Sequence, residues 1–191
     1  MWPWEHLAFG YLLYSLAIRA TTGDPPRGAS VVVLAVATQV PDLVDKPLAW
    51  SLDVFAVGYA VGHSVFVVGP LLVVAAILAW RRGPRASRFV GASAVGHLSH
   101  LLGDLVYPLV LGDGLLVERL LWPVATFEPA VDSGGFLGRV AVFFHRYLEQ
   151  LLALEFGPAF LVQVGLVLGV LALWLVDGRP GLGLLRPPIR N

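Results

Sequence analysis

The sequence predicts an all-α protein, an integral membrane bundle of about five hydrophobic helical segments with one further amphipathic helix. Composition is the first reason: 57% of the 191 residues are hydrophobic and only 14% are charged, whereas soluble domains carry about 25% charged residues. The second reason is the length of the apolar runs, several of which reach the ~20 residues that a helix needs to cross a bilayer. The third is a late stretch in which charged residues recur at helical spacing.

Three of the apolar segments, residues 54–80, 89–111 and 157–176, are each long enough to span a membrane as one helix. Two earlier segments, residues 6–18 and 28–40, are short for a full span. All five are expected to belong to one membrane-embedded bundle.

The basic residues predict how these segments are oriented, because Lys and Arg concentrate in cytoplasmic loops. The densest basic loop follows the third segment and contains Arg81, Arg82, Arg85 and Arg88. With this loop in the cytoplasm, five spans put the N-terminus outside, the C-terminus inside and residues 112–156 outside. We therefore expect a multi-pass protein of the cell membrane, with the lipid bilayer as its partner.

The outward stretch is expected to contain two amphipathic elements, a short run over residues 114–127 and a longer helix over residues 136–156. The expected domain organisation is a single membrane-embedded helical domain over residues 1–177. A loose cytoplasmic tail over residues 178–191 follows, where Gly and Pro recur.

Cysteine is absent, so disulfides and thiolate metal sites are excluded. Thirteen basic residues balance 13 acidic ones, which leaves no basic surface for nucleic acid, and no nucleic-acid partner is expected. Any metal ion must therefore be held by histidines and carboxylates. All five histidines lie in or beside apolar segments, where ionisable groups are costly and usually mark function.

The strongest cluster of such groups lies in the fourth segment and contains His97, His100 and Asp104. Spacings of three and seven place these side chains on one face of a helix. His100 and Asp104, at i and i+4, can bind one metal ion together, as the paired histidines of zinc-binding helices do. The alternative is a structural pair in which His100 donates a hydrogen bond to Asp104. We interpret the later pair His145 and Glu149 as part of a solvated helix face.

Asp42 and Asp45 follow the second segment directly, in a Pro-Asp-Leu-Val-Asp sequence, so their carboxylates are expected at the end of that segment. Carboxylates three residues apart can share or bridge metal ions, and hard oxygen ligands suit Zn, Mn or Mg. An ordinary turn with a helix cap is the alternative. His63 lies inside the longest apolar segment, where Ser64 can orient its ring, and His6 begins the first segment.

Helix rise brings five of these residues to a similar level. At ~1.5 Å per residue, His63 lies roughly 27 Å above the basic loop, His100 roughly 18 Å and Asp104 roughly 24 Å, on neighbouring antiparallel helices. His6 starts the first segment and Asp42 follows the second, so both belong to the outer side. We therefore expect these five side chains to converge toward the extracytoplasmic face.

At these residues the chain resembles the YdjM-like family of membrane-bound, metal-dependent hydrolases, which looks like a membrane relative of the zinc-dependent phospholipase C and single-strand nuclease superfamily. The resemblance covers roughly residues 1–125 and implies an α-helical hydrolase with a metal held by His and Asp. It rests on five motifs in order: an early His (His6), a Pro-Asp turn (Asp42, Asp45), a His-Ser pair (His63, Ser64), a GxxxHxxxD helix (Gly96, His100, Asp104) and an LLWP segment (Leu120 to Pro123).

The chain departs from the family pattern at two places. The family turn usually reads Pro-Asp-x-Asp, whereas one extra residue separates Asp42 from Asp45 here. The family usually carries Arg-Gly shortly before its His-Ser pair, where this chain has Tyr59 and Ala60. The substrate therefore stays open at this stage.

The predicted function is metal-dependent hydrolysis at the outer membrane face, with a phosphoester or other lipid-like compound as substrate. One or two divalent ions, Zn ahead of Mn or Mg, would lower the pKa of bound water to ~7. Asp45 is expected to bridge two ions or to act as general base. Ser64 is expected to support the ligands, and His97 is expected either to support them or to be a further ligand. The predicted metal ligands are His6, Asp42, His63, His100 and Asp104.

Two other functions fit the same residues. The first is a non-enzymatic membrane scaffold or carrier, whose intramembrane His/Asp cluster relays protons or stabilises the bundle. The second is haem binding by two histidines, which ranks lower because the histidines are accompanied by aspartates, and these suit harder metals.

Overall fold

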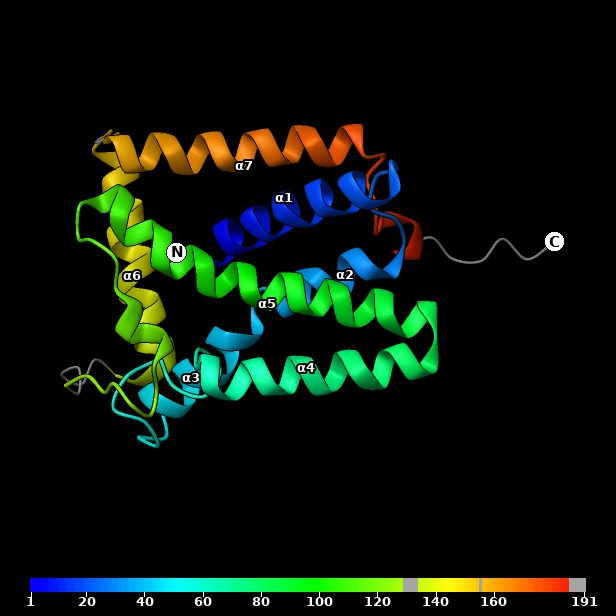
Figure 1. The fold of residues 1–191 in the computed structure, drawn as a ribbon. Helices are drawn as coiled ribbons and strands as arrows, with labels where there is room; N and C mark the ends of the chain where they lie inside the picture. Colours follow the sequence, from blue (N-terminus) through cyan, green and yellow to red (C-terminus); the bar gives the residue numbers. More distant parts are fainter. Residues whose placement is uncertain (129–133, 155, 186–191) are drawn as a thin grey trace. The chain divides into compact units, whose positions relative to one another are not determined.

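The computed structural model describes residues 1–128, 134–154 and 156–185. All regular elements of these residues are helical, which confirms the predicted all-α class (Figure 1). In chain order the elements are α1 (Pro3–Thr22), α2 (Ala29–Ala37), α3 (Val40–Trp50), α4 (Val65–Arg82), α5 (Pro84–Leu111), the 3-10 turn η1 (Val117–Leu120), α6 (Gly135–Leu152), α7 (Pro158–Val176) and the 3-10 turn η2 (Leu182–Leu185).

Among the described residues, three helices are long and apolar enough to cross a membrane: α4, α5 and α7. They match the three long apolar segments of the sequence. In the most apolar 18 residues of α4, and likewise of α7, only 11% is buried inside the protein. Such exposure is expected for helices that face lipid. The two shorter segments are also helical, but α1 does not meet the same criteria over its 20 residues and α2 has only nine.

The first of two compact units comprises Met1–Gln39, Leu72–Asp104 and Gly165–Asn191. Its core is aliphatic and aromatic and draws on α1, α2, α5 and α7. The buried core residues are Ala8, Tyr11, Tyr14, Val31, Leu34, Ala92 and Val170.

Two glycines let helices of this first unit approach each other closely. A Cβ atom on Gly96 would lie 2.7 Å from the backbone oxygen of Leu34, and one on Gly10 would lie 2.5 Å from the side chain of Thr38. Real side chains do not tolerate such distances, so α5 and α1 each pack against α2 through glycine. This packing holds the part of α5 that carries His100 against the C-terminal end of α2.

The second unit comprises Val40–Leu71 and Leu105–Val164. In it α3 packs on α6 through the ring of Trp50, whose centroid lies 6.0 Å from that of Phe136 and 6.3 Å from that of Phe143. These contacts cover part of one side of an amphipathic helix that has no buried residue.

The long amphipathic helix predicted over residues 136–156 is confirmed by α6. The shorter run predicted over residues 114–127 is helical only at η1. The predicted tail over residues 178–191 contains η2, and its part beyond residue 185 lies outside the described residues.

The structure corrects the helix predicted over residues 54–80. Residues 54–64 form turns and bends ahead of α4. The reason is the carboxylate of Asp45, which accepts hydrogen bonds from backbone amides of this segment in place of helical carbonyl groups. His63 and Ser64 therefore lie in a turn before α4 and not inside a long helix.

The turn that the Pro-Asp motif implies at Asp42 and Asp45 is also corrected, because both residues lie within α3. Pro41 is the second residue of this helix, a place where its missing N–H is not needed. An ion pair between Asp42 and Lys46, one turn later, stabilises the helix further.

Candidate metal centre

His100 is held in the first unit by a hydrogen bond that determines where its proton sits. Its Nδ1 lies 2.7 Å from the backbone oxygen of Thr38, and Nδ1 must donate because a carbonyl oxygen only accepts. In the neutral ring, Nε2 then carries a lone pair. This Nε2 lies 3.6 Å from Oδ2 of Asp104, one turn later on α5, and both side chains are buried.

His6 approaches the same carboxylate from α1. Its ring stacks on that of His100 with the centroids 3.7 Å apart, and its Nε2 lies 3.3 Å from Oδ1 of Asp104. Neither ring nitrogen of this buried histidine forms a hydrogen bond with the described residues. The amino group of Met1 lies 3.2 Å from Oδ1 and brings a positive charge to the carboxylate. Two histidines and one carboxylate thus converge within this unit.

In the second unit one histidine, His63, lies between two carboxylates. Nδ1 of its ring lies 2.8 Å from Oδ2 of Asp45, and Nε2 lies 3.6 Å from Oδ1 of Asp42. Since the Asp45 carboxylate also accepts backbone hydrogen bonds, it is the acceptor here and Nδ1 is the donor. Nε2 of His63 therefore turns its lone pair toward Asp42, whose other oxygen forms the ion pair with Lys46.

Asp45 is fully buried and organises the turn before α4. Its carboxylate accepts hydrogen bonds from the backbone amides of Ala60 at 2.7 Å, Gly62 at 2.9 Å and His63 at 3.1 Å. A Cβ atom on Gly62 would lie 3.0 Å from the backbone oxygen of Pro41, so a larger residue would push the turn away from α3. These contacts orient His63, while the general-base or bridging role of Asp45 stays a prediction.

The distances in each cluster fit a divalent metal ion. With Zn–N and Zn–O bonds of ~2.0–2.2 Å and tetrahedral angles, neighbouring ligand atoms lie about 3.4 Å apart. The separations of 3.6 Å between Nε2 and carboxylate oxygen are near this value and exceed the ~2.7–2.9 Å of a charge-assisted hydrogen bond. Side chains of a His/Asp group that could hold a metal ion occur in both units: His100 and Asp104 in the first, Asp42 and His63 in the second.

The remaining predicted residues lie beside these clusters or apart from them. His97 is half-buried on α5 and is not a member of the His/Asp group. Ser64 is buried and donates a hydrogen bond to the backbone oxygen of Trp122. His145 and Glu149 lie 3.2 Å apart with exposed side chains, which agrees with the solvated helix face expected for them.

Sequence reasoning missed several residues that surround the clusters. The carbonyl group of Thr38 has no sequence signature, because any residue at that position would offer the same oxygen. Lys46 could have been found from its i, i+4 spacing to Asp42. Arg119 lies over the ring of Tyr59, which in turn contacts His63, and only the fold brings Arg119 there.

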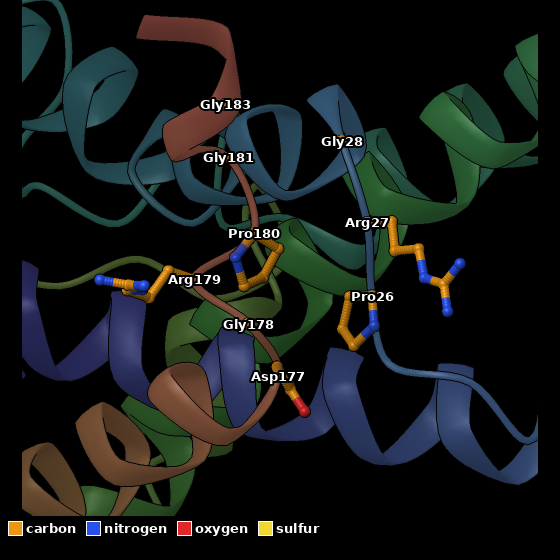
Figure 2. Close-up of a pocket in the computed structure, with 9 residues that line it drawn as sticks. All are labelled: Pro26, Arg27, Gly28, Asp177, Gly178, Arg179, Pro180, Gly181 and Gly183. Atoms are coloured by element: carbon orange, nitrogen blue, oxygen red, sulfur yellow. The ribbon is translucent and has the colours of Figure 1, made fainter. Parts of the chain in front are cut away.

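A separate pocket of about 410 Å³ lies in the first unit, beyond the C-terminal end of α7 (Figure 2). Beside it the buried carboxylate of Asp177 accepts hydrogen bonds from Tyr11 and Ser15 and pairs with Arg19. Burial alone would raise the pKa of Asp177, but these three partners outweigh burial and hold the pKa below its ordinary value. Helix rise puts Arg19 roughly 20 Å from His6 along α1, so this pocket is remote from the His/Asp cluster of the same unit. It is lined by Pro26, Arg27, Gly28, Asp177, Gly178, Arg179, Pro180, Gly181 and Gly183.

Fold and clusters together define a class of protein: a helical membrane protein with buried His/Asp groups of the kind that bind divalent metals. Within this class the chain belongs to the YdjM inner membrane protein family, whose family model matches residues 1–178. No curated protein and no solved structure matches the chain. Membership confirms the resemblance that the sequence motifs indicated, and together with the apolar helices it supports a location in the membrane.

Proposed function

We propose that this protein is a metal-dependent hydrolase of the membrane. The proposal is carried by one observation that is made for both His63 and His100. In each ring Nε2 lies 3.6 Å from a carboxylate oxygen, while Nδ1 donates a hydrogen bond to a different oxygen. Metal-binding imidazoles are oriented in this way through their second nitrogen. The proposed ligands are those named from the sequence: His6, Asp42, His63, His100 and Asp104.

Zinc is the metal that this ligand set favours, with Mn or Mg as alternatives. Imidazole nitrogen suits Zn, whereas carboxylate oxygen accepts all three ions. The notion of one or two bound ions follows the sequence prediction, and the metal stoichiometry of the purified protein gives their number.

A bound divalent ion would supply water with a pKa of ~7 and a positive charge against which an oxyanion can develop. The residues of the chain prepare the ligand set for this chemistry. Thr38 and Asp45 select the nitrogen that His100 and His63 present to the metal. Burial of these side chains limits competition from bulk water. Asp45 as general base would complete the predicted mechanism.

We propose a phosphoester or another lipid-like compound as substrate, and a site toward the extracytoplasmic face. Support for the substrate comes from α5, a helix apolar enough to cross a membrane that carries His100 and Asp104, since a lipid can reach such a site without leaving the membrane. Support for the side comes from the basic loop between α4 and α5, which is expected in the cytoplasm.

The test is the metal content of the full-length protein purified in detergent, measured by elemental analysis together with hydrolysis of a chromogenic phosphoester. His100→Ala should lower the bound metal at least tenfold and abolish metal-dependent hydrolysis. His145→Ala, which removes an exposed histidine of α6, is the matched control and should retain both. A parent protein without divalent metal after zinc loading would overturn the proposal.

A metal-free scaffold or carrier is the second candidate function, and a specific observation favours it. The carboxylates of both clusters already face positive charges: Asp104 pairs with the amino group of Met1, and Asp42 with Lys46. In that case His100→Ala should lower the melting temperature, while the parent and the variant both stay without metal. The metal assay therefore separates the two functions directly.

A further inference from the structure

The segment between α5 and α6 returns to the turn that carries His63, and both parts belong to the second unit. Ser64 donates a hydrogen bond to the backbone oxygen of Trp122, and the Trp122 ring contacts that of Phe55 edge-on, with centroids 5.6 Å apart. η1 lies just before Trp122 and is closed by its own backbone hydrogen bonds. This segment is therefore fastened to the candidate site at several points.

Arg119, in η1, extends toward the same turn. Its guanidinium carbon lies 4.7 Å from the centroid of the Tyr59 ring, and the Tyr59 ring meets that of His63 edge-on at 4.9 Å. Arg119 is half-buried, whereas its neighbour Glu118 is exposed. Arg119 is thus the more buried of the two charged residues, and the Tyr59 ring contacts both its guanidinium and the ring of His63, a proposed metal ligand.

A guanidinium in this place has a specific chemical use. Its planar array of N–H groups matches two oxygens of a phosphoryl group, and the resulting hydrogen bonds are among the strong ones in proteins. Contact with an aromatic face holds the cation in position before the ligand arrives, which lowers the entropy lost on binding. A purely structural contact between Arg119 and Tyr59 would have no such consequence for ligands.

We propose that Arg119 binds the phosphoryl group of the substrate and makes the site selective for phosphoesters, with Tyr59 as its positioning residue. This inference rests on the proposed hydrolase function, because it names the substrate class of that same site. The phosphoryl group can belong to a lipid headgroup or to a soluble ester, and Arg119 recognises the feature that both share.

The experiment measures binding of inorganic phosphate to the zinc-loaded, full-length protein in detergent by isothermal titration calorimetry. Arg119→Gln should weaken phosphate binding at least tenfold. Arg119→Lys keeps the charge but loses the planar array, so its phosphate affinity should lie between those of the parent and of Arg119→Gln. Tyr59→Leu should also weaken binding although Arg119 is present, whereas Tyr59→Phe should not. Arg85→Gln is the matched control, since Arg85 also lies over an aromatic ring, that of Phe89, and it should bind phosphate as the parent does.

Competition by glycerol phosphate and by micelles of a short-chain phosphatidic acid identifies the source of the phosphoryl group. The compound that competes more strongly indicates whether the phosphoryl group belongs to a soluble ester or to a lipid headgroup. Both compounds should bind Arg119→Gln more weakly than the parent. Equal phosphate affinity in the parent, Arg119→Gln and Arg119→Lys would overturn the inference. Two variants are used so that the inference is still tested if one of them folds poorly. Failure of the hydrolase proposal is a different result, because it appears as absence of zinc in the parent protein.

Discussion

Replacement of Asp45 by Asn separates the two roles that this residue can have. The side chain is fully buried, and its two oxygens accept hydrogen bonds from the amides of Ala60, Gly62 and His63 and from the His63 ring. An Asn can keep the oxygen that serves Ala60 and His63, but its NH2 group then faces the amide of Gly62. We expect the loss of this charge-assisted bond, and of the charge itself, to cost about 2–3 kcal/mol.

That cost should lower the melting temperature by about 4–12 °C for a chain of this size. Since the ring of His63 keeps its acceptor, the affinity for zinc should fall only about 10- to 100-fold, as for the loss of a partner that orients a ligand. Thermal unfolding in detergent and competition with a zinc chelator measure the two effects. Asp42→Asn is the comparison, because it alters a proposed ligand outside the buried network and should reduce zinc binding more and stability less.

A different pattern would refute this reasoning. If Asp45→Asn melts within about 1 °C of the parent and binds zinc equally well but has lost hydrolysis, then Asp45 acts as general base and its backbone hydrogen bonds matter little. The same experiment therefore decides between the orienting role that the contacts favour and the catalytic role that the sequence pattern predicts.

Three further predictions follow from other parts of the molecule. Gly96→Ala should destabilise the protein by about 1–3 kcal/mol, measured by thermal unfolding, because its Cβ atom would lie 2.7 Å from the backbone oxygen of Leu34; an unchanged melting temperature would contradict the close packing. Asp177 has a pKa below its ordinary value, so its pairing stabilises the fold above the unfolded pKa of ~3.9 and this contribution disappears as the pH falls through the lower folded pKa. Asp177→Asn should therefore lower stability at pH 7 and flatten the acid limb of a stability profile; an unaltered profile would refute the network. Removal of metal with a chelator should lower the melting temperature, since zinc at 100 times its Kd adds about 2.7 kcal/mol, and His100→Ala should not respond to the chelator.

The long helices could be predicted from the sequence because apolar runs of about 20 residues are typical of helices that span a membrane. α7 falls within its predicted segment, whereas α4 ends at Arg82, past the predicted end at residue 80, and α5 begins at Pro84, before the predicted start at residue 89. The boundary of α4 could not be predicted in the same way. Residues 54–64 contain no Asp, Glu, Lys or Arg and so extend the apolar run of the helix that follows. What prevents helix formation there is the carboxylate of Asp45, which lies 15 residues before Ala60, the first amide that it binds.

The candidate site was partly visible for a similar reason. His100 and Asp104 are predictable as a pair because helical spacing alone brings them together. The pairing of His63 with Asp45 depends on a tertiary turn, and the partner of His100 is a backbone oxygen that no residue type identifies. Arg119 lies beyond α5 in the chain, and only the return of its segment to Tyr59 gives it a functional interpretation.

The geometry of the two histidines also bears on the choice between a structural pair and a metal ligand. A structural pair requires Nε2 to donate to the carboxylate, but Nδ1 of His100 and of His63 is already a donor, so a neutral ring has no second proton to give. A protonated ring would have that proton and would be expected to form a charge-assisted bond of ~2.7–2.9 Å, whereas both separations are 3.6 Å. A divalent ion accounts for both observations, because it accepts the lone pairs of Nε2 and of the carboxylate at once. His63 and His100 come from different parts of the chain and share this feature, which supports the proposal that the His/Asp group holds a metal ion.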